Sequence, residues 1–149
     1  MDVWYFAYGS NLLRSQMEAR TGPIRTGEAA PRVARLPGYR LAFNMNGGDG
    51  RVYSNVMQPG AGVLGVIYRC GAEVLEKLDH YELGYVRQQG KVMDSAGEEL
   101  DAIFYVAKPE WVCAESQPSA AYLEKILTGA REQGLDEAYV RGIAALAGM

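Results

Sequence analysis

The pattern of apolar and polar positions begins with one short apolar run, Val3 to Tyr8. This run is β-branched and aromatic and contains no glycine or proline, which predicts a buried strand. It leads directly into Gly9-Ser10-Asn11 and then into two leucines. Small polar residues at the end of a buried strand are typical of a turn. Their accessible backbone also raises the question of whether the turn binds a negatively charged group.

A short helix is predicted after this turn. Ser15 is followed three residues later by Glu18, which is the pattern of a capping box and predicts a helix that reaches about Arg20. The sequence Thr21-Gly22-Pro23 is expected to end it.

Strand-like runs separated by turn residues fill the middle of the chain. They cover residues 26–36, 39–45, 51–58 and 62–69. The separator Asn46–Gly50 is rich in glycine, but it lacks the Lys-Ser/Thr ending of a phosphate-binding loop. It also precedes a strand-like run and not a helix, so it predicts a hairpin turn.

Over residues 72–82 the spacing of the apolar residues changes to the period of an α-helix. Val74, Leu75, Leu78 and Glu82 are spaced so that they share one helical face.

Further strands and helices complete the order of elements. Strands are expected at residues 85–93 and 100–107, and helices at 119–133 and 137–147, with Asp136 as the N-cap of the last helix. Several strands, one helix, more strands and then helices predict a single α+β domain over residues 1–149. Its sheet is expected to be mixed, mostly antiparallel, and curled into a small barrel with flanking helices.

Composition narrows the class of protein. The chain has 149 residues, 48% of them apolar, and a net charge of −3, so it is expected to be globular, without general attraction to nucleic acid or anionic membranes. No apolar run is long enough for a transmembrane helix, and the start MDVWYF does not resemble a secretory signal. Cys70 and Cys113 are too few for a disulfide framework, and with His80 as the one histidine a zinc site is not expected. These features predict a cytoplasmic protein with reduced thiols.

Glu82 is the first candidate for chemistry. Its spacing from Leu75 and Leu78 places it on the apolar helical face, where burial is expected to raise the pKa of its carboxylate. The negative end of the helix dipole acts in the same direction. A carboxylate that titrates near neutral pH can serve as a general base or acid. The alternative is that the helix ends at Tyr81 and that Glu82 points into water.

The Gly9-Ser10-Asn11 turn is the second candidate. Successive free backbone N–H groups at such a turn can hold a carboxylate or stabilise an oxyanion, and Gly9 allows a ligand to approach the backbone closely. Ser10 is not in the Gly-x-Ser-x-Gly pattern of a nucleophile, and His80 is not clearly available as its base. The alternative is an ordinary turn. Ten tyrosines form a third signal, because a few of them could line a pocket.

Together these residues resemble the γ-glutamyl cyclotransferase family. The segment YFAYGSNLL, Tyr5 to Leu13, is similar to the family's N-terminal signature, and residues 65–82 resemble the segment that ends in its catalytic glutamate. Residues 34–44 and 118–139 resemble two further blocks in the same order. The Gly-Ser-Asn form of the turn resembles that of enzymes acting on γ-glutamyl amino acids.

The resemblance implies a mixed α/β fold with a small barrel and a reaction that uses no metal and no cofactor. It implies that Glu82 is the general base and acid. The substrate-binding residues that it implies are Tyr5, Phe6, Ala7, Tyr8, Gly9, Ser10, Asn11, Tyr85 and Tyr122. The chain departs from the family's usual pattern after Glu82, where Leu83 and a shorter connection flank the expected position of the leaving group.

The implied reaction is intramolecular. The α-amine of a γ-glutamyl group attacks its own γ-carbonyl and gives 5-oxoproline and a free amine or amino acid. The implied partner is a small-molecule γ-glutamyl substrate, in glutathione turnover or in a specialised biosynthesis, and the expected assembly is a monomer or a homodimer. The alternative function is a non-catalytic module of the same fold that binds a small anion.

Overall fold

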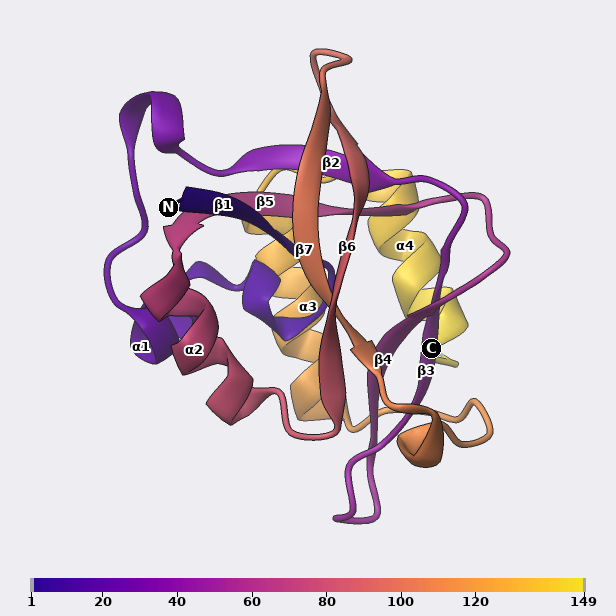
Figure 1. The fold of residues 1–149 in the computed structure, drawn as a ribbon. Coiled ribbons are helices and arrows are strands. Elements are labelled where there is room, and N and C mark those ends of the chain that lie inside the picture. The colour runs from indigo at the N-terminus through magenta and orange to yellow at the C-terminus, as the bar shows by residue number, and fades with distance from the viewer. Residues whose placement is uncertain (1, 149) are drawn as a thin grey trace.

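A barrel of five strands forms the centre of the computed structural model, which describes residues 2–148 (Figure 1). The strand order is β1-β5-β2-β6-β7, and only the contact between β1 and β7 is parallel. The barrel strands are β1 (Asp2–Ala7), β2 (Arg32–Leu36), β5 (Val63–Gly71), β6 (Tyr85–Asp94) and β7 (Glu99–Ala107). The predicted α+β class and the mostly antiparallel barrel are therefore confirmed. The predicted domain, residues 1–149, extends one residue beyond the described range at each end.

A two-stranded hairpin extends from the barrel beside the end of β7. It pairs β3 (Arg40–Asn46) with β4 (Val52–Met57), and its register shifts between Phe43 and Met45. The glycine-rich segment between these strands forms the turn, as the sequence predicts. The Asn55 side chain anchors the hairpin to the barrel, because its oxygen accepts a hydrogen bond from the Ala107 backbone N–H at 3.0 Å.

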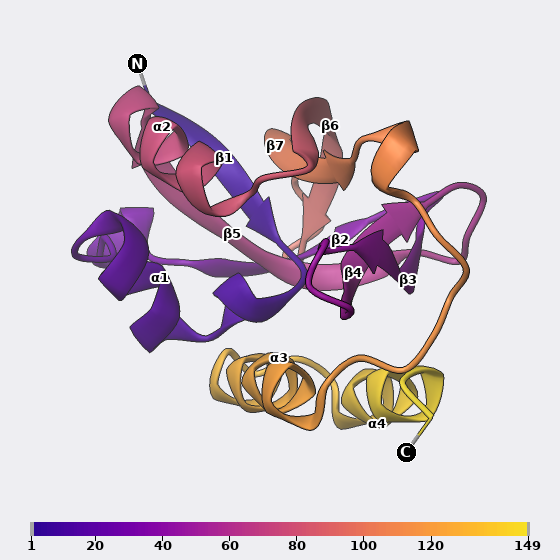
Figure 2. The ribbon, with the colours of Figure 1, turned by 90° about the horizontal axis from the view of Figure 1, so that it is seen from below.

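Four helices flank the strands within the described chain. They are α1 (Arg14–Thr21), α2 (Ala72–Tyr81), α3 (Ala120–Glu132) and α4 (Glu137–Leu146). Figure 2 shows α3 and α4 end to end as a layer below the barrel, with α1 and α2 grouped at one side. Helix α3 lies directly on the turn after β1, because a Cβ on Gly129 would collide with the backbone of Leu12 and Leu13. None of the described helices is long and apolar enough to cross a membrane.

The predicted start of the first helix is wrong. Helix α1 begins at Arg14, with Leu13 in the N-cap position and no side-chain cap, so Ser15 lies inside the first turn and does not cap it. The turn before it already forms a single 3-10 turn at Ser10–Leu12, and this leaves no extended residue at Ser15. Asp136 does occupy the N-cap position of α4, but its side chain makes no capping hydrogen bond.

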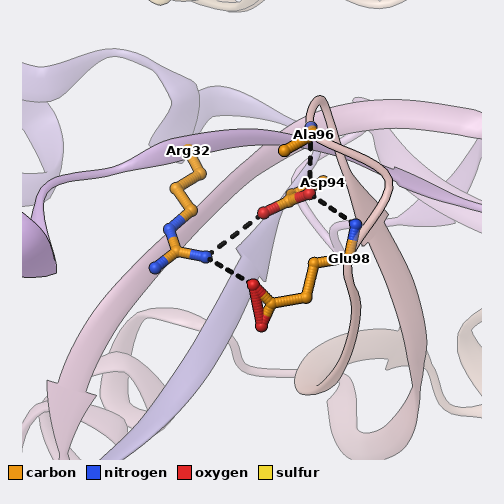
Figure 3. A network of polar contacts seen from close by, with 4 residues as sticks. All are labelled: Arg32, Asp94, Ala96 and Glu98. Atoms are coloured by element: carbon orange, nitrogen blue, oxygen red, sulfur yellow. Dashed lines mark hydrogen bonds and ion pairs between the residues drawn. The ribbon is translucent and has the colours of Figure 1, made fainter.

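A polar network closes the barrel at the far end of β6. Figure 3 shows Asp94 accepting hydrogen bonds from the backbone N–H groups of Ala96 (3.0 Å) and Glu98 (2.8 Å). Arg32 on β2 binds the other carboxylate oxygen of Asp94 at 3.2 Å and pairs with the Glu98 carboxylate at 3.6 Å. Strands β2 and β6 pair at only two positions, Ala34 with Asp94 and Arg35 with Met93. The network therefore reinforces a short seam of the barrel.

Candidate active site

A cavity of about 420 Å³ opens where the end of β1, the end of α2, strand β4 and helix α3 meet. Most of the residues that the sequence predicts for a site line it. These are Tyr5, Tyr8, Gly9, Ser10, Asn11, Glu82, Tyr85 and Tyr122. Phe6 and Ala7 do not, since they are 0% and 1% exposed and pack in the barrel core. Phe6 faces the other side of β1 from Tyr5, as successive residues of a strand do.

Glu82 is held at the end of α2. The helix ends at Tyr81, and Glu82 is its C-cap with φ −103° and ψ 46°. This backbone does not leave the side chain in water, because the residue is half-buried and lines the cavity. Burial raises the pKa of the Glu82 carboxyl to about 7, Arg20 opposes this increase, and Asp79 adds to it. The predicted rise in pKa is confirmed, and burial is its main cause.

Asn11 connects Glu82 to its surroundings. Its amide nitrogen donates to the Tyr5 hydroxyl at 3.0 Å and to a Glu82 carboxylate oxygen at 3.4 Å. Its amide oxygen accepts from Gln16 and from Arg20, both at 3.1 Å. Because acceptors lie on one side and donors on the other, the amide has one orientation that satisfies all four groups. Asn11 is only 3% exposed, so this arrangement is well shielded from solvent.

The turn after β1 lines the cavity and contains backbone N–H groups that the chain leaves unused. Its internal hydrogen bonds run from Leu12 N–H to the Gly9 carbonyl and from Leu13 N–H to the Ser10 carbonyl. Within residues 2–148, the N–H groups of Gly9, Ser10 and Asn11 donate to no acceptor of the chain. A Cβ on Gly9 would collide with the Ser54 hydroxyl, so a glycine permits this approach between the turn and β4.

Ser10 has no base beside it. Its hydroxyl accepts a hydrogen bond from Gln16 at 2.7 Å, and His80 is exposed on α2 and does not line the cavity. The structure therefore gives no support to Ser10 as an activated nucleophile.

Tyrosine side chains form another part of the cavity wall, and two of their hydroxyls contact Ser54. The Tyr122 hydroxyl lies 2.8 Å from the Ser54 hydroxyl and accepts from the Ser54 backbone N–H at 3.2 Å. Tyr85 donates its hydroxyl to the Ser54 carbonyl at 2.7 Å, and Tyr8 donates to the Tyr105 carbonyl at 2.7 Å. Burial raises the pKa of Tyr122 to about 12 and raises that of Tyr8 and Tyr85 as well. These hydroxyls therefore stay protonated and act as hydrogen-bond donors.

Several lining residues are not among the sequence predictions. They are Gln16, Arg20, Met45, Gly47, Tyr53, Ser54, Tyr81, Tyr105 and Lys125. Leu83, which the sequence places beside the leaving group, also lines the cavity. Gln16 and Arg20 are four residues apart on α1, a spacing that places both on one helical face behind the turn. That spacing could have indicated Gln16 and Arg20 from the sequence. Ser54 could not be found in this way, because it reaches the cavity only through the docking of the β3–β4 hairpin. Within the described chain, no group of three or more His, Cys, Asp or Glu side chains could hold a metal ion.

Comparisons with known proteins identify the family of this chain. The sequence model of the AIG2-like family matches residues 62–143. Human gamma-glutamylcyclotransferase is 31% identical over 152 aligned positions, which cover 95% of this chain and 77% of that protein. This chain belongs to the AIG2-like γ-glutamyl cyclotransferase family. The mouse protein of the same name is 30% identical with the same coverage.

A solved structure supports the same family. A protein described as gamma-glutamyl cyclotransferase superposes with a TM-score of 0.85 at 28% identity, over 97% of this chain and 88% of the other. The resemblance seen in the sequence is thus confirmed, and the relatives support an enzyme of this family.

Proposed function

We propose that this chain is a γ-glutamyl cyclotransferase that converts a γ-glutamyl compound into 5-oxoproline and a free amine or amino acid. The observation that carries the proposal is the position of Glu82. Burial raises the pKa of its carboxyl to about 7, and it lines the same cavity as the turn, whose N–H groups have no partner in the described chain. A general base works best when its pKa lies near the working pH.

The turn supplies the binding of negative charge. The N–H groups of Gly9, Ser10 and Asn11 can donate to the α-carboxylate of the glutamyl group and to the oxygen of the γ-carbonyl, which becomes negative as the ring closes. The hydroxyls of Tyr8, Tyr85 and Tyr122 fix the cavity wall through their hydrogen bonds to the protein. This enclosure favours a folded glutamyl chain whose α-nitrogen approaches its own γ-carbon.

The proton balance assigns two steps to Glu82. First the carboxylate takes a proton from the α-ammonium group, and the freed amine forms the new C–N bond. The γ-carbon then releases the original amide nitrogen, and Glu82 returns its proton to that nitrogen. The second proton of the attacking nitrogen also moves to the departing amine, which leaves as an ammonium ion. The lactam keeps one N–H, and no external nucleophile is consumed.

The proposal is tested by incubating the purified protein with a panel of γ-glutamyl amino acids and γ-glutamyl amines and measuring 5-oxoproline by mass spectrometry. We expect release from at least one compound without added metal or nucleotide. Complete loss of turnover in a chelator, restored by a divalent cation, would contradict the mechanism. Tight binding of panel compounds without any release would favour the non-catalytic binding module.

A further inference from the structure

Arg20 is a cation at the cavity that is not in direct contact with a carboxylate of the described chain. It is half-buried and lines the cavity with Glu82 and Asn11. Among the described residues it forms no ion pair, whereas Arg25, Arg87 and Arg131 each pair with a carboxylate. The charge of Arg20 lowers the pKa of Glu82 from a distance, but no carboxylate of residues 2–148 occupies its donors, so this half-buried guanidinium is suited to bind an anion from outside.

The guanidinium of Arg20 is already oriented. Its Cζ lies over the Tyr81 ring, 4.7 Å from the ring centroid. One nitrogen donates to the Asn11 amide oxygen at 3.1 Å. A guanidinium has five N–H donors, so its edge keeps donors for a ligand, and an edge of this kind can bind a carboxylate through two parallel hydrogen bonds.

The position of Arg20 corresponds to the outer part of the cavity. Tyr5 and Asn11 are 4% and 3% exposed and form the inner part, whereas Tyr81, which covers Arg20, is 52% exposed. In the proposed reaction the glutamyl part occupies the enclosed end, and the amine that departs faces the opening. A carboxylate on that departing group would therefore lie at the level of Arg20.

The distance between the nitrogen and the carboxylate of a departing amino acid fits the spacing of Glu82 and Arg20. In an α-amino acid the carboxylate carbon lies about 2.5 Å from the nitrogen, from ordinary bond lengths. Glu82 must reach that nitrogen, and Arg20 is separated from Glu82 by the single amide of Asn11, with contacts of 3.4 Å and 3.1 Å on its two sides. One substrate can thus present its nitrogen to Glu82 and its carboxylate to Arg20.

We propose that Arg20 is a specificity-determining residue that binds the carboxylate of the departing amino acid. This inference rests on the proposed function, and it assigns to Arg20 the discrimination between γ-glutamyl amino acids and γ-glutamyl amines. Lys125 is the other cation that lines the cavity. It is exposed and donates to Gln16 at 3.2 Å, which makes Lys125 the matched control.

The test uses two substrates that differ only in this carboxylate, γ-glutamyl-alanine and γ-glutamyl-ethylamine. We expect the wild-type kcat/KM to be about 10–100-fold higher for the first, the range of a hydrogen bond between charged groups. Arg20→Gln should remove most of this ratio, because kcat/KM for γ-glutamyl-alanine should fall about 10–100-fold further than kcat/KM for the ethylamine compound. The loss for the ethylamine compound measures what Arg20 does for Asn11 and Glu82. Lys125→Met should preserve the ratio.

Two outcomes would overturn the inference. Equal losses for both substrates in Arg20→Gln would show that Arg20 only positions Asn11 or binds the glutamyl part. Loss of the ratio in Lys125→Met, with Arg20→Gln unaffected, would assign the carboxylate to Lys125. Calorimetric binding of both compounds to Glu82→Gln and to Glu82→Gln/Arg20→Gln gives the same comparison without turnover. Failure of the proposed reaction is thereby distinguished from failure of the role of Arg20.

Discussion

The amide nitrogen of Asn11 lies 3.4 Å from a carboxylate oxygen of Glu82, although 71 residues separate them in the chain. The contact joins the turn after β1 to the end of α2. It also means that the half-buried carboxylate has a donor directed at it, while Gln16 and Arg20 prevent the amide from turning over. The Glu82 carboxylate, which carries the proton, is therefore held in a fixed position. The other polar groups of the residues that line the cavity include hydroxyls and backbone N–H groups.

Replacing Glu82 with Gln should abolish turnover and keep the fold. Glutamine has nearly the same size but cannot take up a proton near neutral pH. A missing general base costs about a hundredfold to ten-thousandfold in rate. Turnover of the best panel substrate, calorimetric binding and a melting curve check this prediction. Near wild-type turnover in Glu82→Gln would mean that another residue is the base.

Activity and stability should respond to pH in opposite directions around Glu82. The rate should rise with pH through about 7, as the carboxylate loses its proton. The folded-state pKa lies above the unfolded value, so the folded state binds the proton more tightly and the free energy of unfolding falls between about pH 4.5 and pH 7. Glu82→Gln lacks this loss. We therefore expect the difference in melting temperature, Glu82→Gln minus wild type, to become more positive from pH 5 to pH 8. If this difference does not change with pH, the raised pKa of Glu82 is contradicted.

Adding side-chain atoms at Gly9 should harm activity more than stability. Gly9→Val narrows the space between the turn and Ser54 and restricts the backbone, so we expect at least a tenfold loss of kcat/KM with a fold that persists. Outright unfolding would make Gly9 a structural residue only.

A companion series isolates the contact that Gly9 permits. In Gly9→Ala the new Cβ meets the Ser54 hydroxyl, so Ser54→Ala should recover part of the lost melting temperature in the double variant. Gly142→Ala serves as control, because nothing lies within 4 Å of its Cβ. Strictly additive melting shifts would show that the contact with Ser54 is not the cause.

Removing the Tyr122 hydroxyl should impair catalysis. Tyr122→Phe loses the contacts with the Ser54 hydroxyl and N–H, at 2.8 Å and 3.2 Å. We expect about a tenfold loss in kcat/KM, equivalent to roughly 1.4 kcal/mol. Tyr53→Phe is the matched control, because the Tyr53 ring packs edge-on against Tyr122 but its hydroxyl binds Asp49 at 2.6 Å. Equal effects of the two substitutions would exclude a specific role for the Tyr122 hydroxyl.

Asp94→Asn should weaken the barrel without changing the chemistry. Hydrogen bonds from Glu98 and Ala96, and then Arg32, lower the pKa of the Asp94 carboxyl. This stabilisation is present above the unfolded pKa and is lost as the pH falls through the lower folded value. The wild-type protein should therefore lose more stability on acidification than Asp94→Asn. Melting curves from pH 7 to pH 3 measure this, with kcat/KM at pH 7 as the control that should not change.

Local patterns were sufficient to predict the elements that build the fold. The continuous apolar run Val3–Tyr8 predicts a strand buried on both faces, and the spacing of Leu75 and Leu78 predicts the buried face of a helix; the structure buries Trp4 to Tyr8 and both leucines. The start of α1 was not predictable from Ser15 and Glu18, because the preceding 3-10 turn fixes where the helix begins. A capping pattern shows where a helix can begin, but here the preceding residues already form a turn and the helix begins one residue before Ser15.

The site was only partly accessible to sequence reasoning, for a physical reason. Glu82 carries its own signal, since a carboxylate on an apolar helical face is unusual. Ser54 carries none, because an ordinary serine in a strand becomes part of the site only when the hairpin β3–β4 docks against α3. Arg20 likewise looks like a surface residue at the end of a helix until Asn11 and Tyr81 are placed around it.

The packing of α3 on the turn after β1 has a consequence for when the enzyme first becomes competent. Gly129 lies against the Leu12–Leu13 backbone, and the same helix supplies Tyr122 to the cavity. A nascent polypeptide that has already formed its barrel still lacks one wall of the cavity and the support behind the turn. The chain should therefore bind ligand only after its last quarter has been synthesised. During refolding, ligand binding should recover later than β-structure.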